Sequence, residues 1–140
     1  MSKHRLSADD RHFLTEFETG GIAPDRFDHR AHVRLAYAYL VEHEPDTAVS
    51  LMRGALMAFL RRNDIDISKY HETMTNAWIL AVRHFMSTTP AAPSADAFIE
   101  ANPILLDSKI MLTHYSADVL FSDQARVRFV EPDVERIPRH

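Results

Sequence analysis

Hydrophobic residues recur every three or four positions along most of the chain, which is the spacing of amphipathic α-helices. No sustained alternation of hydrophobic and polar residues, the pattern of a half-buried β-strand, interrupts it. The sequence therefore predicts an all-α protein, a compact helical bundle of about five to seven helices. We expect one domain over residues 1–140, with an ordered core over about 7–131 and an extended C-terminal tail.

Capping residues indicate where the helices begin and end. Ser7 and Asp28 are typical N-cap residues, and Gly20-Gly21 is a typical helix end. They predict a first helix between Ser7 and Gly20 and a second from Asp28 to about His43. The later helices are expected at 46–62 with Asp46 as N-cap, at about 69–86, at 94–99 with Ser94 as N-cap, at 103–110, and in a last turn after Ser122.

Three histidines fall on the apolar faces of the second and fourth predicted helices. At about 100° per residue, His29 and His32 share a face with Leu40. On the fourth helix, His71 shares a face with Trp78 in the same way. We therefore expect the second and fourth helices to contact each other through the faces that carry His32 and His71.

Inward-facing imidazoles on two packed helices are typical of a metal centre. Because the chain contains no cysteine, any metal site must be built from His, Asp, Glu or Tyr. Three nitrogen ligands from His29, His32 and His71 would hold a divalent transition metal (zinc, iron or copper) and leave a position open for substrate. The alternative is that these are core histidines, bonded to hydroxyl or carbonyl groups of the protein.

Two further residues are candidates for catalysis. Glu72 directly follows His71, and Tyr115 lies in a polar segment near the C-terminus. Either side chain would transfer protons if the fold placed it beside the metal. The first functional hypothesis is thus a metal-dependent enzyme acting on a small molecule. The second is a non-catalytic helical module that binds a ligand or a protein and forms a homodimer.

Charge and composition argue against some classes of binding partner. The formal net charge is −4, so there is no basic surplus with which to bind nucleic acid or anionic lipid. No apolar run has the length of a signal peptide core or a membrane span, and we expect a cytoplasmic protein. The sequence also lacks a phosphate-binding loop, a G-x-S-x-G elbow and an H-E-x-x-H motif.

Three separated motifs carry a family resemblance: residues 27–36 (FDHRAHVRLA), residues 69–75 (KYHETMT), and a C-terminal motif made of 115–116 (YS) and 129–133 (FVEPD). Together they resemble a family of small bacterial proteins of unknown function, with F-x-H-x-x-H-x-R-x-A, Y-H-E-T-x-T and C-terminal F-x-x-P-D motifs. The resemblance covers about residues 10–138 and implies a small helical fold without an established reaction. One departure is His114, where a second tyrosine is expected.

Overall fold

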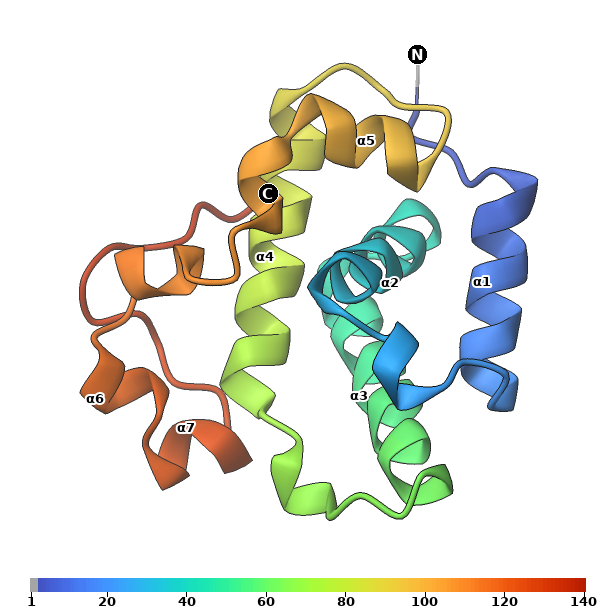
Figure 1. Cartoon of the computed structure of the whole chain (residues 1–140). Helices are drawn as coiled ribbons and strands as arrows, with labels where there is room; N and C mark the ends of the chain where they lie inside the picture. The colour runs from blue at the N-terminus through green and yellow to red at the C-terminus, as the bar shows by residue number, and fades with distance from the viewer. Residues whose placement is uncertain (1–2) are drawn as a thin grey trace.

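The computed structural model describes residues 3–140 and, within that range, contains helices and no β-strand. The predicted all-α class is confirmed (Figure 1). The α-helices are α1 (Ala8–Thr19), α2 (His29–Glu42), α3 (Pro45–Arg62), α4 (Glu72–Thr88), α5 (Ala95–Ala101), α6 (Ala117–Leu120) and α7 (Asp123–Val127). Short 3-10 helices are η1 (Pro24–Arg26), η2 (Ile67–Lys69), η3 (Pro103–Leu106) and η4 (Ile110–Thr113).

Helix α2 lies at the centre of the bundle and contacts α1, α3, α4 and α5 (Figure 1). Its second half is buried on nearly every side, as expected of a helix surrounded by others. The predicted contact between the second and fourth helices is confirmed. Helices α6 and α7 lie on the side of α4 away from α1 (Figure 1), and α7 packs directly on α4.

Local capping chemistry sets most helix starts as predicted. The side chains of Ser7, Asp28, Ser94 and Ser122 each accept a hydrogen bond from a backbone N–H in the first turn of the helix that follows. Gly20 ends α1 with a φ of 89°, a left-handed conformation that glycine adopts without strain.

Three predicted boundaries were wrong. Helix α3 begins at Pro45 with Glu44 as its N-cap, because proline fits the first helical position, and Asp46 lies inside the first turn. Helix α4 begins at Glu72, three residues later than the predicted Lys69, since the preceding segment forms η2. The helix predicted at 103–110 is two separate 3-10 helices, η3 and η4.

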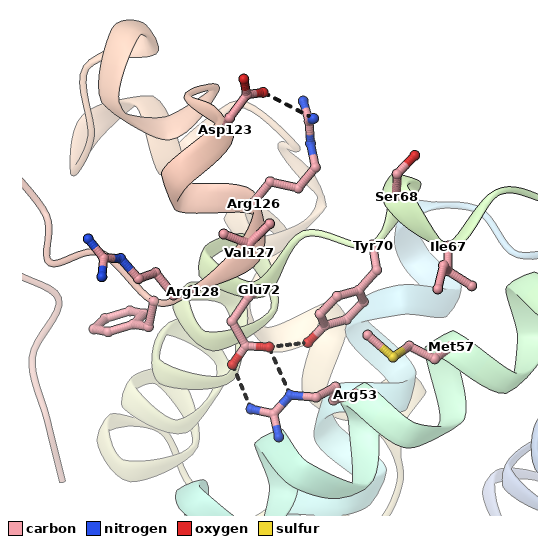
Figure 2. Close-up of a pocket in the computed structure, with 11 residues that line it drawn as sticks. Arg53, Met57, Ile67, Ser68, Tyr70, Glu72, Asp123, Arg126, Val127 and Arg128 are labelled. Atoms are coloured by element: carbon pink, nitrogen blue, oxygen red, sulfur yellow. Dashed lines mark hydrogen bonds and ion pairs between the residues drawn. The ribbon is translucent and has the colours of Figure 1, made fainter.

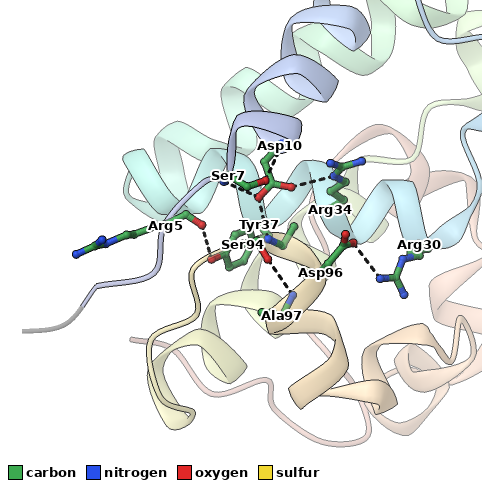
Figure 3. Close-up of polar contacts among 10 residues, drawn as sticks. Arg5, Ser7, Asp10, Arg30, Arg34, Tyr37, Ser94, Asp96 and Ala97 are labelled. Carbon is green, nitrogen blue, oxygen red and sulfur yellow. Dashed lines mark hydrogen bonds and ion pairs between the residues drawn. The ribbon is translucent and has the colours of Figure 1, made fainter.

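A buried carboxylate joins three helices at one end of the bundle (Figure 3). Asp10 on α1 is 1% exposed and accepts hydrogen bonds from the backbone N–H groups of Ser7 and Ala95 and from Arg34 Nε. Burial alone would raise its pKa, but these donors hold the pKa of Asp10 below its ordinary value. Asp10 therefore stays ionised and fixes α1 and α5 against α2.

The irregular C-terminal segment is fastened to the bundle by two side chains of the motifs. The Thr73 hydroxyl donates to the Arg128 carbonyl and accepts from the Val130 N–H, at 2.9 and 3.0 Å. The hydroxyl of Tyr115 donates to the Val130 carbonyl at 2.6 Å. After α7 the chain continues without helix to its end, and Ile137 is buried. The tail thus lies on the bundle and forms part of its surface.

Candidate functional site

His71 is the N-cap of α4. The prediction that it lies inside this helix was therefore wrong. Its Nδ1 accepts a hydrogen bond from the Met74 N–H at 3.0 Å. Its Nε2 lies 2.8 Å from the Leu120 carbonyl oxygen, so Nε2 carries the proton and donates to it. Both ring nitrogens of His71 are therefore occupied by backbone groups.

His29 is the first residue of α2 and uses its ring in a similar way. Its Nε2 donates to the carbonyl oxygen of Leu105, at 2.9 Å. The ring packs edge-on against Trp78, with 4.7 Å between the ring centroids. His29 thus links α2 to α4 by packing and to η3 by a hydrogen bond.

The three predicted metal ligands are neighbours, but the structure does not arrange them as a metal centre. The rings of His29 and His32 are stacked with centroids 6.5 Å apart, and His32 and His71 line a common pocket. Among residues 3–140, no three or more His, Asp or Glu side chains are grouped so that they would hold a metal ion. The predicted zinc, iron or copper ion at His29, His32 and His71 stays a prediction.

His32 lines a small cavity of about 210 Å³, which we call the His32 pocket. Helices α2 and α3, η2 and the start of α4 form its walls. Burial, together with the adjoining His29, lowers the pKa of His32 to about 4, so its imidazole is neutral at physiological pH. The lining residues are Phe27, His32, Leu56, Phe59, Leu60, Lys69, Tyr70, His71, Met74 and Thr75.

Glu72 belongs to a second, larger pocket, where its carboxylate faces Arg53 and Tyr70 (Figure 2). Four donor atoms hold this carboxylate. Arg53 on α3 donates to both carboxylate oxygens at 2.9 and 2.6 Å, the Tyr70 hydroxyl donates at 2.7 Å, and Asn76 Nδ2 donates at 2.9 Å. The Arg53 guanidinium lowers the pKa of Glu72 to about 2. Glu72 is therefore a fixed carboxylate near neutral pH, which does not favour the proton-transfer role predicted for it.

Tyr115 lies in the core and lines neither of these pockets. Burial raises the pKa of Tyr115 to about 12, so the phenol keeps the proton that it donates to Val130. The catalytic role predicted for Tyr115 gains no support from this placement, which instead gives the residue a structural role.

The second cavity has a volume of about 620 Å³, and we call it the Arg53 pocket. Figure 2 shows the Glu72 carboxylate turned towards Arg53 and the Tyr70 hydroxyl, while Arg126 extends towards Asp123. The apolar and aromatic part of its lining consists of Met57, Ile67, Tyr70, Val127 and Phe129. The charged part consists of Arg53, Glu72, Asp123, Arg126 and Arg128.

The Arg53 pocket was not predicted from the sequence, although two of the segments that line it contain motif residues. The segment 69–75 supplies Tyr70 and Glu72, and the segment 129–133 supplies Phe129. Arg53 on α3 and Arg126 on α7 lie outside the motifs. The available signal was the aromatic Phe129 in the C-terminal motif, which lines this pocket.

Comparison with known proteins adds no relative: no protein-family model, curated protein or solved structure matches this chain. The family resemblance of the motifs stays a prediction. Within residues 3–140, no helix combines the length and the apolar character needed to cross a membrane.

Proposed function

We propose that this protein is a ligand-binding module whose Arg53 pocket takes a small amphipathic organic anion. The supporting observation is the composition of the pocket, which combines a largely apolar wall with three guanidinium groups. Its volume of about 620 Å³ lies in the usual range for small-molecule sites. The proposal develops the second hypothesis of the sequence analysis, in which the histidines are part of the structure.

The charges around the Arg53 pocket favour an anion. Three arginines face two carboxylates there, whereas the whole chain has a net charge of −4. Arg128 is exposed and has no ion-pair partner among residues 3–140. The pair between Arg126 and Asp123 is 3.3 Å long and solvent-exposed, so exchanging Asp123 for a ligand carboxylate or sulfonate costs little.

The apolar wall favours a ligand with a ring or an aliphatic body. Val127 is 76% exposed and Ile67 is 44% exposed, so covering them removes apolar surface from water. Tyr70 and Phe129 add aromatic faces beside them. The Arg53–Glu72 pair fixes the pocket before a ligand arrives, because both groups are already hydrogen-bonded.

Metal-dependent catalysis has weaker support than binding. His71 uses both ring nitrogens in hydrogen bonds to backbone groups and so has no lone pair free for a metal, while His29 uses Nε2 to donate to the carbonyl oxygen of Leu105. The metal-dependent reaction and the homodimer named in the sequence analysis both stay predictions.

The fluorescent anion anilinonaphthalene sulfonate tests this proposal, because it joins an aromatic body to one negative charge. We expect Val127→Asp to weaken saturable binding of this probe about tenfold or more, since it introduces a like charge into the apolar wall. Val134→Asp is the matched control, because Val134 is also exposed, at 62%, and lies outside the Arg53 pocket. Equal weakening by the two variants, or none by Val127→Asp, would refute the assignment.

The neutral analogue phenylnaphthylamine separates the charge from the rings. We expect Arg126→Gln to weaken the sulfonate probe about tenfold and to leave binding of the neutral analogue nearly unchanged. If Arg126→Gln weakens both probes equally, the anion preference is wrong even though the pocket binds.

A further inference from the structure

The imidazole of His32 lines the His32 pocket and makes no hydrogen bond within the described part of the chain. No hydrogen bond joins either of its ring nitrogens to any group in residues 3–140. Within residues 3–140, Arg83 Nε is the only fully buried side-chain nitrogen or oxygen without a hydrogen-bond partner, so the unpartnered nitrogens of His32 are not fully buried. The nitrogens of His32 therefore keep accessible surface, and the His32 pocket is the cavity that this residue lines.

Apart from the exposed Lys69, the other polar side chains that line the His32 pocket already have hydrogen-bond partners. His71 uses both nitrogens, and the Thr75 hydroxyl donates to the His71 carbonyl at 3.0 Å. The Tyr70 hydroxyl donates to Glu72 in the Arg53 pocket. A bound water needs two to four polar partners, so a site with one free imidazole and mostly apolar walls suits an organic group better.

The size and walls of the His32 pocket define what fits. Its volume of about 210 Å³ is close to that of an engineered cavity of ~150 Å³ that binds benzene. The Phe27 ring meets the His32 ring edge-on with centroids 5.9 Å apart, and Phe59 and Leu60 continue the apolar wall. A charged group placed beside His32 and these apolar side chains would lose its hydration and find no counter-charge on the neutral ring, since the charged lining residue, Lys69, is exposed.

We propose that the His32 pocket is a second binding site, which takes a single-ring phenol whose hydroxyl donates to a ring nitrogen of His32. The aromatic ring packs among Phe27, Phe59 and Leu60 and replaces the empty volume there. The depressed pKa of His32 supports this geometry, because a neutral imidazole has a free lone pair at physiological pH. The site is independent of the Arg53 pocket, although Tyr70 lines both.

Phenol and toluene form a matched pair of probes, because they share a ring and differ in a hydroxyl against a methyl group. We expect phenol to shift the backbone amide NMR signals of the residues around the His32 pocket and to bind about fivefold more tightly than toluene. Toluene is the more hydrophobic of the two, so a preference for phenol reports the hydrogen bond. In His32→Leu we expect the preference to disappear, while the same substitution at the exposed His43 leaves it intact.

The imidazole nitrogen signals of His32 in the unaltered protein provide a test that does not depend on how the variant folds. We expect phenol to shift them and toluene to leave them nearly unchanged. The proposal is overturned if phenol moves no signal around the His32 pocket, if it moves them without affecting the His32 nitrogens, or if the preference survives in a folded His32→Leu protein. Because the sulfonate probe is too large for this pocket, its results bear on the Arg53 pocket alone.

Discussion

Replacing His71 with alanine is expected to lower the free energy of unfolding by about 2–3 kcal/mol. The variant loses the N-cap of α4, so the Met74 N–H has no side-chain acceptor. It also leaves the carbonyl oxygen of the buried Leu120 without its donor. The measurement is urea unfolding at pH 7, followed by far-UV circular dichroism.

A His71→Asn variant separates the loss of the N-cap hydrogen bond from the loss of the hydrogen bond to Leu120. Asparagine is a good N-cap residue but is too short to replace the ring that reaches Leu120, so we expect it to restore about 1 kcal/mol of the loss. If His71→Ala unfolds at the same urea concentration as the unaltered protein, the hydrogen bonds of His71 to Met74 and Leu120 do not stabilise the fold.

Acidification from pH 7 to about pH 4 is expected to remove about 2–3 kcal/mol of stability through His32 alone. Burial lowers the pKa of His32 to about 4 in the folded protein, against about 6.5 in the unfolded chain. The unfolded chain therefore binds the extra proton first. The contribution of His32 is fully present above about pH 6.5 and is lost as the pH falls through the folded-state pKa.

The surroundings of His32 reinforce this direction. His29 on the same helix and Lys69 and His71 across the His32 pocket are groups that carry positive charge when protonated, and Tyr70 there is neutral. We expect His32→Leu to lose less stability than the unaltered protein between pH 7 and pH 4.5, and His43→Leu to behave like the unaltered protein. Equal losses in the His32 and His43 variants would contradict a buried, neutral His32.

The fold was predictable from the sequence wherever local chemistry sets the boundary. Ser7, Asp28 and Ser94 cap helices because their side chains bond to the next turn, which is a relation within three residues. The start of α4 was not predicted correctly because its N-cap is a histidine, a residue type that the usual N-cap preferences do not include. The break between η3 and η4 follows Asp107, whose side chain accepts from the Lys109 N–H and forms a turn that periodicity does not reveal.

The candidate site was less predictable, because its chemistry depends on long-range contacts. Periodicity placed His29 and His32 on the partly buried face of α2, and the structure brings His32 and His71 to one pocket. Periodicity could not show that Leu105 and Leu120 present carbonyl oxygens to His29 and His71, since these residues lie 76 and 49 positions away in the sequence. His71 has both ring nitrogens hydrogen-bonded to backbone groups and so has no lone pair left for a metal, whereas the bond from His29 to Leu105 occupies its Nε2 alone.

The imidazole nitrogen NMR spectrum, recorded at neutral pH before and after one equivalent of zinc, tests the assignment of these histidines most directly. We predict that His29 and His71 give the signals of rings protonated at Nε2, and that zinc leaves the signals of both unchanged. The contradicting result is a joint shift of His29, His32 and His71 that is complete at one equivalent of zinc, which would establish the three-nitrogen metal centre instead.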